Sequence, residues 1–363
     1  MKKKLLLLLV SAVLGSAFVF SGCGKSNSQA TANIGSEKEV GTAEATESEQ
    51  SAETESEQTA ETTDVIRLAV MTANITQEAA LIGQETGIYE KYGLDVQTTE
   101  FAAGINTVDA LTLNQADIGM VADYAWVNRL GATADSNTLK IFTRLGTGNG
   151  SGTNLYINKD LASGVEDLSG KAIATVTGTV WDYYNSSLIE QYNLKDVEIL
   201  NTSSPAEMEA LYESGKAAAF FGSGQTATMA EALDFTQKEL SLKDLGVTTD
   251  MFYIADESYL EKNEDVVKRF LQANQEIYDY ITNNSQAAAD LVSEKLAIPQ
   301  ETFLGGLKEA DLLIDLKQQS IDSLNTINSW AKEQGRYDLD YDAKDFIYPD
   351  AIKDLYPDRV DIK

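Results

Sequence analysis

The sequence predicts an α/β fold with two lobes, each built on a mostly parallel sheet flanked by helices. Strand-like apolar runs alternate with helical segments along most of the chain. This alternation is typical of parallel sheets that are covered by helices. The segment with regular apolar periodicity is roughly 300 residues long, which is about the length at which one hydrophobic core gives way to two.

The first half of this globular part is predicted to contain four strands and three helices. The expected strands are 65–71, 94–101, 117–121 and 139–145, and the expected helices are 74–86, 105–114 and 123–131. Asn74 and Gln77 have the spacing of a capping box, so we expect the first helix to begin there.

The second half continues the pattern and ends in helices. The expected strands are 154–158, 171–176, 197–201, 217–221 and 250–255, and 265–283 is the clearest amphipathic helix. Ser204 followed by Pro205 combines a helix cap with proline at the first helical position. The glycine-rich stretch 146–152 lacks the Gly-Lys-Ser/Thr ending of a nucleotide-binding loop, so we expect a flexible connector.

Several predicted strands end in short turns of small or polar residues that open a helix. These turns are 72–74, 103–106, 122–123, 177–179 and 222–223. In open α/β sheets, ligands lie beyond the carboxyl ends of the strands, close to helix N-termini. If three turns come from one lobe and two from the other, their N–H groups converge on a cleft between the lobes.

The N-terminus reads as a signal peptide, residues 1–22. Met1–Lys4 is basic, and 5–20 is uncharged but shorter than the about 20 residues that a membrane-spanning helix needs. Small residues precede the single cysteine, Cys23, and this arrangement resembles a bacterial lipobox. That resemblance implies cleavage before Cys23 and lipidation of its thiol, so that the protein is extracytoplasmic and anchored to the cell membrane. An ordinary signal peptide followed by an unmodified thiol is the alternative.

Residues 24–63 are rich in Ser, Thr, Ala, Gln and Glu. Such a composition buries too little apolar surface to offset the entropy of ordering. We therefore expect 23–63, including the lipidated cysteine, to be a disordered acidic linker.

Charge and composition exclude several functions. The formal net charge is −29, which argues against nucleic-acid partners, because these require clusters of Lys and Arg. The chain has no histidine and one cysteine, which removes the commonest general base, the usual zinc site and thiol chemistry in the globular part. We therefore expect no catalytic residue, no metal and no cofactor. A Ser or Thr nucleophile paired with Lys stays formally open, although no spacing indicates one.

Four stretches together carry a resemblance to a known family. They are 83–96 (Gly-Gln-Glu-Thr-Gly-Ile-Tyr-Glu-Lys-Tyr-Gly-Leu-Asp-Val), 100–104 with 116–119, 166–171 leading into 177–179, and 211–219. In order and spacing they resemble the nitrate/sulfonate/taurine solute-binding proteins of ABC importers (the SsuA/TauA or NMT1/THI5-like family). The similarity spans about 65–346.

This resemblance implies a periplasmic-binding-protein type II fold. Lobe 1 would comprise 64–153 plus 252–363 and lobe 2 would comprise 154–251, with crossings near Thr153 and Met251. The family's ligand contacts fall on the turns described above. Carried over, they are Thr72, Asn74, Gly104, Asn106, Ala122, Asp123, Gly178, Thr179, Trp181 and Ser223. Asn74 can equally be a plain helix cap.

The implied function is capture of a small anionic or zwitterionic solute by closure of two lobes. An ABC permease and ATPase would be the partners, the protein would be a monomer, and it would not be an enzyme. The turns hold no Lys or Arg, so N–H and hydroxyl donors would bind the anionic group, and Trp181 is the candidate for stacking. The alternatives are a neutral heterocycle such as a thiamine pyrimidine precursor, a sensory binding module, and a hydrolase or lyase on the same fold.

Overall fold

The computed structural model describes residues 63–363 apart from 73, 102–103 and 178. The chain divides into two units, Met1–Gln58 and Thr59–Lys363, of which the first lies outside the described residues. The predictions of a signal peptide, of lipidation at Cys23 and of an acidic linker therefore concern residues outside the described part. Within the described part, none of the helices combines the length and the apolar character needed to cross a bilayer.

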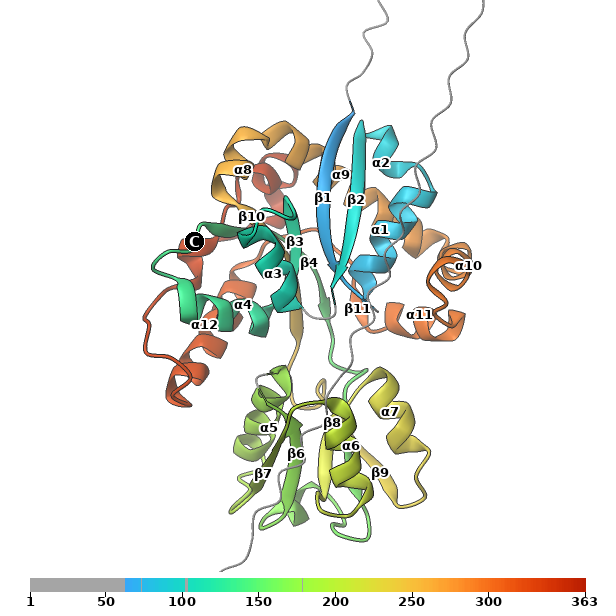
Figure 1. Cartoon of the computed structure of the whole chain (residues 1–363), viewed down its shortest axis with the longest axis vertical. Coiled ribbons are helices and arrows are strands. Elements are labelled where there is room, and N and C mark those ends of the chain that lie inside the picture. The colour runs from blue at the N-terminus through green and yellow to red at the C-terminus, as the bar shows by residue number, and fades with distance from the viewer. Residues whose placement is uncertain (1–62, 73, 102–103, 178) are drawn as a thin grey trace, which may run out of the picture. The chain divides into compact units, whose positions relative to one another are not determined.

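The second unit contains a six-stranded sheet with the strand order β11-β4-β10-β3-β1-β2 (Figure 1). Its strands are β1 (Asp64–Met71), β2 (Leu94–Phe101), β3 (Ile118–Ala122), β4 (Leu139–Gly148), β10 (Thr249–Asp256) and β11 (Ala310–Asp311). β1 pairs in parallel with β2 and β3, whereas β10 and β11 pair antiparallel with β4, and β10 also with β3.

A five-stranded sheet with the order β7-β6-β8-β5-β9 forms from the middle of the chain. Its strands are β5 (Asn154–Asn158), β6 (Ala172–Val176), β7 (Glu198–Thr202), β8 (Ala219–Gly222) and β9 (Thr236–Ser241). β6 pairs in parallel with β7 and β8, and β5 pairs antiparallel with β8 and β9. Both sheets are therefore mixed.

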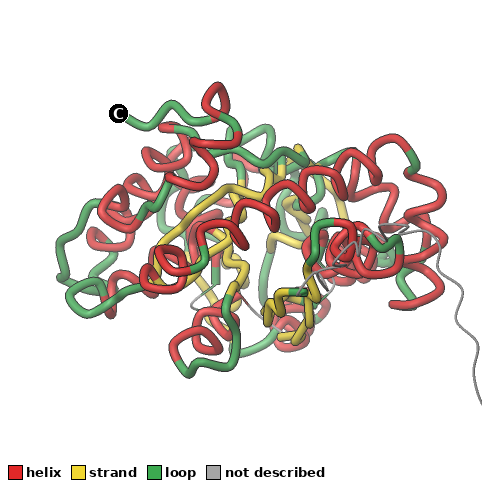
Figure 2. Tube along the Cα trace, turned by 90° about the horizontal axis from the view of Figure 1, so that it is seen from above, coloured by secondary structure: helices red, strands yellow, loops and turns green. Residues whose placement is uncertain are grey.

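Helices accompany both sheets (Figure 2). Those near the six-stranded sheet are α1 (Ile75–Glu85), α2 (Ile88–Lys91), α3 (Gly104–Thr112), α4 (Asp123–Thr133), α8 (Glu257–Lys262), α9 (Glu264–Asn283), α10 (Ser285–Leu296), α11 (Gln300–Leu307), α12 (Gln318–Glu333) and α13 (Asp350–Leu355). Those near the five-stranded sheet are α5 (Val180–Gln191), α6 (Pro205–Glu213) and α7 (Gly224–Glu231). Separate apolar clusters form around the two sheets. Leu68 of β1 and Phe270 of α9 belong to the cluster of the six-stranded sheet. The five-stranded sheet has two clusters, one with Leu155 of β5 and Leu188 of α5 and the other with Tyr156 of β5 and Phe220 of β8.

The predicted α/β class is confirmed, and most predicted strands are present within one or two residues. β9 was not predicted, because its sequence Thr-Gln-Lys-Glu-Leu-Ser has one buried residue, Leu240, and so no apolar run. The connector predicted over 146–152 was wrong at its start, because Gly146 to Gly148 continue β4 and pair with β10. A Cβ on Gly146, which has φ +147°, would clash with the carbonyl oxygen of Asp311. The glycine thus permits close strand pairing here.

Two segments connect the sheets, 149–153 and 242–248, and they touch each other. The N–H of Leu242 donates to the carbonyl oxygen of Thr153 (3.0 Å). Gly150 has φ +77°, and a Cβ there would lie 2.6 Å from the carbonyl oxygen of Val247. β10 belongs to the six-stranded sheet from Thr249 onward. The division of this unit into two lobes stays a prediction.

A buried arginine fixes the end of the six-stranded sheet that leads into these connections. Arg144 on β4 donates from Nε and Nη2 to the two carboxylate oxygens of Asp315 (2.5 and 2.8 Å). The same guanidinium lies 3.7 Å from Asp250 on β10 and 3.5 Å from Asp311 on β11. One cation therefore holds three strands together.

Candidate functional site

Three helices begin where the parallel strands of the six-stranded sheet end. The N–H of Thr72 donates to the carbonyl oxygen of Phe101 (2.9 Å), so the ends of β1 and β2 adjoin. A Cβ placed on Gly104, the first residue of α3, would lie 3.7 Å from the backbone nitrogen of Ala122. The structure therefore brings the predicted residues Thr72, Gly104 and Ala122 to one edge, together with the N-termini of α1, α3 and α4.

Asn74 caps α1 as its sequence predicts. Its Oδ1 accepts hydrogen bonds from the N–H and the hydroxyl of Thr76, both at 3.0 Å. Its Nδ2 lies 3.5 Å from the sulfur of Met251, which pairs with Ala122 across β10 and β3. The side chain thus sits at the same edge with its oxygen already in use, while Asn106, in the first turn of α3, is exposed.

Asp123 is 4% exposed and points into the protein. Its Oδ1 accepts from the N–H of Tyr124 (2.6 Å), and its Oδ2 accepts from the N–H of Asp250 (3.0 Å). The pKa of this carboxyl group is raised to about 7, chiefly by burial; the charge of Asp250 also raises the pKa, while the hydrogen bonds from the N–H groups of Asp250 and Tyr124 lower it. Both oxygens are used within the protein, where they tie α4 to the first residues of β10.

In the five-stranded sheet, the corresponding turn at the end of a parallel strand leads from β6 to α5. Thr179 caps α5, with its hydroxyl 3.4 Å from the N–H of Trp181. Gly178 lies outside the described residues. Trp181 is partly buried and packs against both apolar clusters of this sheet. Its indole therefore contributes to the apolar packing of the five-stranded sheet.

Ser223 follows β8 and forms a capping box with Thr226 at the start of α7. It lines a cavity of about 470 Å³ together with Thr153 and Thr249, which flank the connections between the sheets. The structure thus places Ser223 beside the connections.

α5 makes specific side-chain contacts with elements of the six-stranded sheet. Val180 and Tyr183 pack against the apolar clusters of both sheets. Asp182 accepts a hydrogen bond from Nη2 of Arg336 (2.8 Å), which follows α12. Tyr184 shares a hydrogen bond with Thr249 of β10 (3.0 Å). The first turns of α5 therefore contact α12 and β10.

An aromatic cluster that the sequence did not predict lies at this contact. The ring of Trp330 on α12 meets Tyr183 edge-on, with 5.2 Å between centroids, and tilts against Tyr124 at 6.0 Å. The guanidinium of Arg336 lies 5.0 Å from the centroid of Trp330. Asp182 and Arg336 are 154 positions apart, so no local pattern could have joined them.

A groove of about 420 Å³ runs beside this cluster. It is lined by Asp182, Asn185, Trp330 and Arg336 and, at the ends of β6 and β7, by Thr177 and Asn201. Asn185 is 2% exposed, and neither its amide nitrogen nor its amide oxygen has a hydrogen-bond partner in the described part of the chain. Hydroxyl groups, amides and one ion pair therefore offer a small polar molecule both donors and acceptors.

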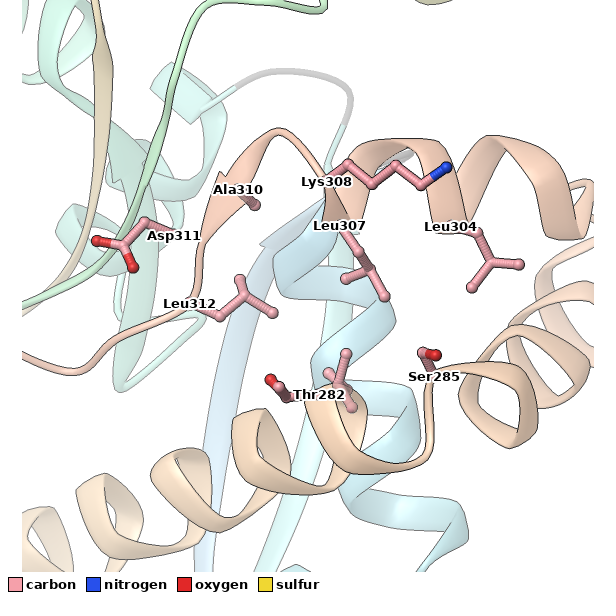
Figure 3. A pocket seen from close by; sticks show the side chains of 9 residues that line it. Thr282, Ser285, Leu304, Leu307, Lys308, Ala310, Asp311 and Leu312 are labelled. Carbon is pink, nitrogen blue, oxygen red and sulfur yellow. The ribbon is translucent and has the colours of Figure 1, made fainter.

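A different cavity, of about 590 Å³, lies between α9, α10, α11 and β11 (Figure 3). Leu304, Leu307 and Leu312 point into it, whereas Asp311 points away. None of the predicted contact residues lines it. Among the residues that the structure describes, no three acidic or cysteine side chains are grouped so that they could hold a metal ion.

Comparison with known proteins assigns the chain to a family. The sequence profile described as NMT1/THI5-like matches residues 74–288, well over half of the chain. The chain belongs to the NMT1/THI5-like family. A protein of Brucella abortus (strain 2308), named "Putative binding protein", is 22% identical to this NMT1/THI5-like chain over 262 residues, covering 69% of this chain and 77% of that protein.

Solved structures share the fold of this NMT1/THI5-like protein. The periplasmic aliphatic sulphonate-binding protein SsuA from Escherichia coli matches with a TM-score of 0.68 and 17% identity, covering 78% of this chain and 92% of that one. The alkanesulfonate-binding protein SsuA from Xanthomonas axonopodis pv. citri, bound to MOPS, matches with a TM-score of 0.63 and 16% identity, covering 78% and 98%. A DszB mutant in complex with biphenyl-2-sulfinic acid also matches, at 0.61 and 11%, covering 82% and 99%. The predicted periplasmic-binding fold is thus confirmed.

Proposed function

We propose that this protein is the solute-binding component of an ABC importer and captures a small anionic or zwitterionic solute of the sulfonate, taurine or nitrate kind. The observation that carries the proposal is the meeting of helix N-termini at one edge of the six-stranded sheet. Gly104 lies so close to Ala122 that the starts of α3 and α4 adjoin, and the start of α1 lies beside them at Thr72 and Asn74.

Helix N-termini attract negative groups, because their first N–H groups lack partners and the helix dipole is positive there. Each terminus contributes about 0.3–1 kcal/mol to binding an anion at an exposed position. Three adjoining termini and the hydroxyl of Thr72 therefore favour an oxyanion. The oxyanion would use the N–H groups other than those of Thr76 and Tyr124, since Asn74 and Asp123 already accept from these two. Arg336 adds a cation that is already paired with Asp182, so the site gains little net positive charge. A zwitterion suits this balance better than a multiply charged anion.

Capture would proceed by closure of two lobes around the solute. The solute shifts the population toward the closed form because it contacts both lobes. The two short connections, 149–153 and 242–248, suit a hinge. The closed form would be the one that permease and ATPase subunits recognise, and the protein would act as a monomer.

The cellular location that we propose follows from the role as a solute-binding component. We infer an extracytoplasmic protein anchored to the membrane by lipidated Cys23, with 24–63 as a tether. The uncharged run before Cys23 and the names of the sulfonate-binding structural neighbours support this.

Binding without catalysis is the function we infer, since the sequence contains no histidine and its one cysteine is Cys23. A neutral heterocycle such as a thiamine pyrimidine precursor, and a sensory role, are the alternatives. No contact in the described part favours either of them over an anionic solute.

The test is a thermal-shift screen of the purified protein with butanesulfonate, MOPS, taurine, nitrate and hydroxymethylpyrimidine, followed by calorimetric titration of each compound that acts. We expect at least one sulfonate to raise the melting temperature and to bind with one-to-one stoichiometry. Stabilisation by the pyrimidine alone would favour the neutral alternative. No shift with any of the five compounds would overturn the proposal, and turnover of a bound compound would overturn the assignment as a binding protein.

A further inference from the structure

The contact between α5 and α12 joins side chains that belong to different sheets. Asp182 and Tyr183 sit in the first turn of α5, whose residues Tyr184 and Leu188 are part of the apolar cluster of the five-stranded sheet. Arg336 and Trp330 come from α12 and the residues after it. Their interactions therefore span the two sheets.

α12 is held firmly on the side of the six-stranded sheet. Leu324 belongs to the apolar cluster of that sheet. The hydroxyl of Tyr341, which follows α12, donates to the carbonyl oxygen of Val127 on α4 (2.9 Å). Tyr337 packs so closely on α4 that any Cβ on Gly131 would clash with its ring. Arg336 thus projects toward α5 from a fixed support.

Asp182 is equally well held on the other side. Its Oδ1 accepts a hydrogen bond from the hydroxyl of Thr175 on β6 (3.2 Å), and its Oδ2 accepts from Arg336 (2.8 Å). Its side chain is 10% exposed, and that of Arg336 is 26% exposed. Trp330 lies beneath the guanidinium, so Arg336 makes an ion pair and a cation–π contact at once.

We propose that Arg336 and Trp330 form a clasp with Asp182 and Tyr183 that holds the N-terminal end of α5 against α4 and α12. Arg336 is then a positioning residue, because it acts on Thr179 and the first N–H groups of α5 through Asp182. The inference rests on the proposed function and adds to it that closure is biased by protein groups alone. The clasp therefore sets how much of the population is closed before solute contributes.

The test measures the distance between the two sheets' helices in the purified protein with no solute added. Spin labels are placed at Thr112→Cys on α3 and Glu190→Cys on α5, two exposed positions, in a chain carrying Cys23→Ser. In Arg336→Ala and in Asp182→Asn, we expect the population with the longer distance to rise about fivefold, which corresponds to the roughly 1 kcal/mol that a partly exposed ion pair contributes.

Two further variants separate a clasp from a general loss of structure. The exchanged pair, Arg336→Asp with Asp182→Arg, should restore the ion pair and so shorten the distance in part, because the cation–π contact with Trp330 is lost. Lys332→Ala is the matched control. Lys332 is also on α12, but it pairs with Asp340, which follows α12, and so this pair does not involve α5. It should leave the distances unchanged.

Identical distance distributions in the original chain and in both single variants would overturn the clasp. A longer distance that the exchanged pair does not shorten would overturn it too. Because no solute is present, either result leaves the solute-binding proposal standing. Conversely, failure of every solute to bind would not alter the distance result.

Discussion

The carboxylate of Asp123 accepts a hydrogen bond from the backbone N–H of Asp250, across 127 positions of sequence. This bond joins the first residue of α4 to the strand that enters the six-stranded sheet from the second connection. Its strength depends on the charge of a carboxyl group whose pKa is raised to about 7 by burial. Protonation of Asp123 therefore changes a contact beside the predicted hinge.

The raised pKa makes stability depend on pH. The folded state binds this proton more tightly than the unfolded state, in which the pKa is near 3.8. The resulting stabilisation is complete below about pH 4 and is lost as the pH rises through about 7. We expect urea unfolding to show that Asp123→Asn lowers the difference in unfolding free energy between pH 5 and pH 8 by about 2 kcal/mol. An unchanged difference would show that Asp123 is ionised in the folded protein at both pH values.

Glu78, in the first turn of α1, gives a second and independent prediction. It is 9% exposed, and burial raises its pKa to about 7. The free energy of unfolding depends on pH in the same direction as for Asp123. As the pH rises toward 7 and above, Glu78 becomes charged and the folded protein is destabilised. Glu78→Gln should therefore stabilise the protein at pH 8 by about 1–3 kcal/mol and have little effect at pH 4. Equal effects at the two pH values would contradict this account.

Arg144 should be the most costly charged side chain to remove. It is 6% exposed and supports Asp315, which is 2% exposed, so truncation leaves a buried carboxylate without its cation. We expect Arg144→Met to destabilise the protein by about 3–5 kcal/mol in chemical unfolding. Arg67→Met is the control, because the Arg67–Asp117 pair is more exposed and should contribute about 1 kcal/mol or less. Similar losses in both variants would contradict the difference in burial.

A substitution at Gly146 tests whether this position of β4 requires glycine. Its φ of +147° disfavours side chains, and a Cβ would clash with Asp311. Gly146→Ala should lower the free energy of unfolding by about 1–3 kcal/mol. Gly305→Ala, on α11 with nothing within 4 Å of its Cβ position, should instead stabilise by up to about 1 kcal/mol. A tolerated Gly146→Ala would show that β11 can move away from β4.

Local signals in the sequence predicted the fold well. Asn74, Ser204 and Pro205 mark helix starts that the structure contains, because caps act over two or three residues. The turns that place Thr72, Gly104 and Ala122 at one edge could be predicted in the same way. What the sequence could not predict depends on distant partners. Asp123 turns inward to Asp250.

The aromatic cluster also depends on contacts between residues that are distant in the sequence. Tyr184 is buried, whereas its neighbour Tyr183 meets Trp330 of α12. Nothing near Arg336 in the sequence indicates that it reaches α5. Its role depends on the path of α12 across α4, which only the folded chain defines.

The most direct test of the central claim is calorimetric titration of butanesulfonate into the original chain and into Gly104→Leu. A Cβ at Gly104 finds ordinary van der Waals contacts, so alanine should be tolerated there, while the larger leucine fills the edge where α3 and α4 begin. We predict one-to-one binding to the original chain and its loss in Gly104→Leu, with a cooperative thermal transition showing that the solute-free variant is folded, and unaltered binding in Gly305→Leu. Equal binding by the original chain and Gly104→Leu would contradict a solute site at these helix N-termini.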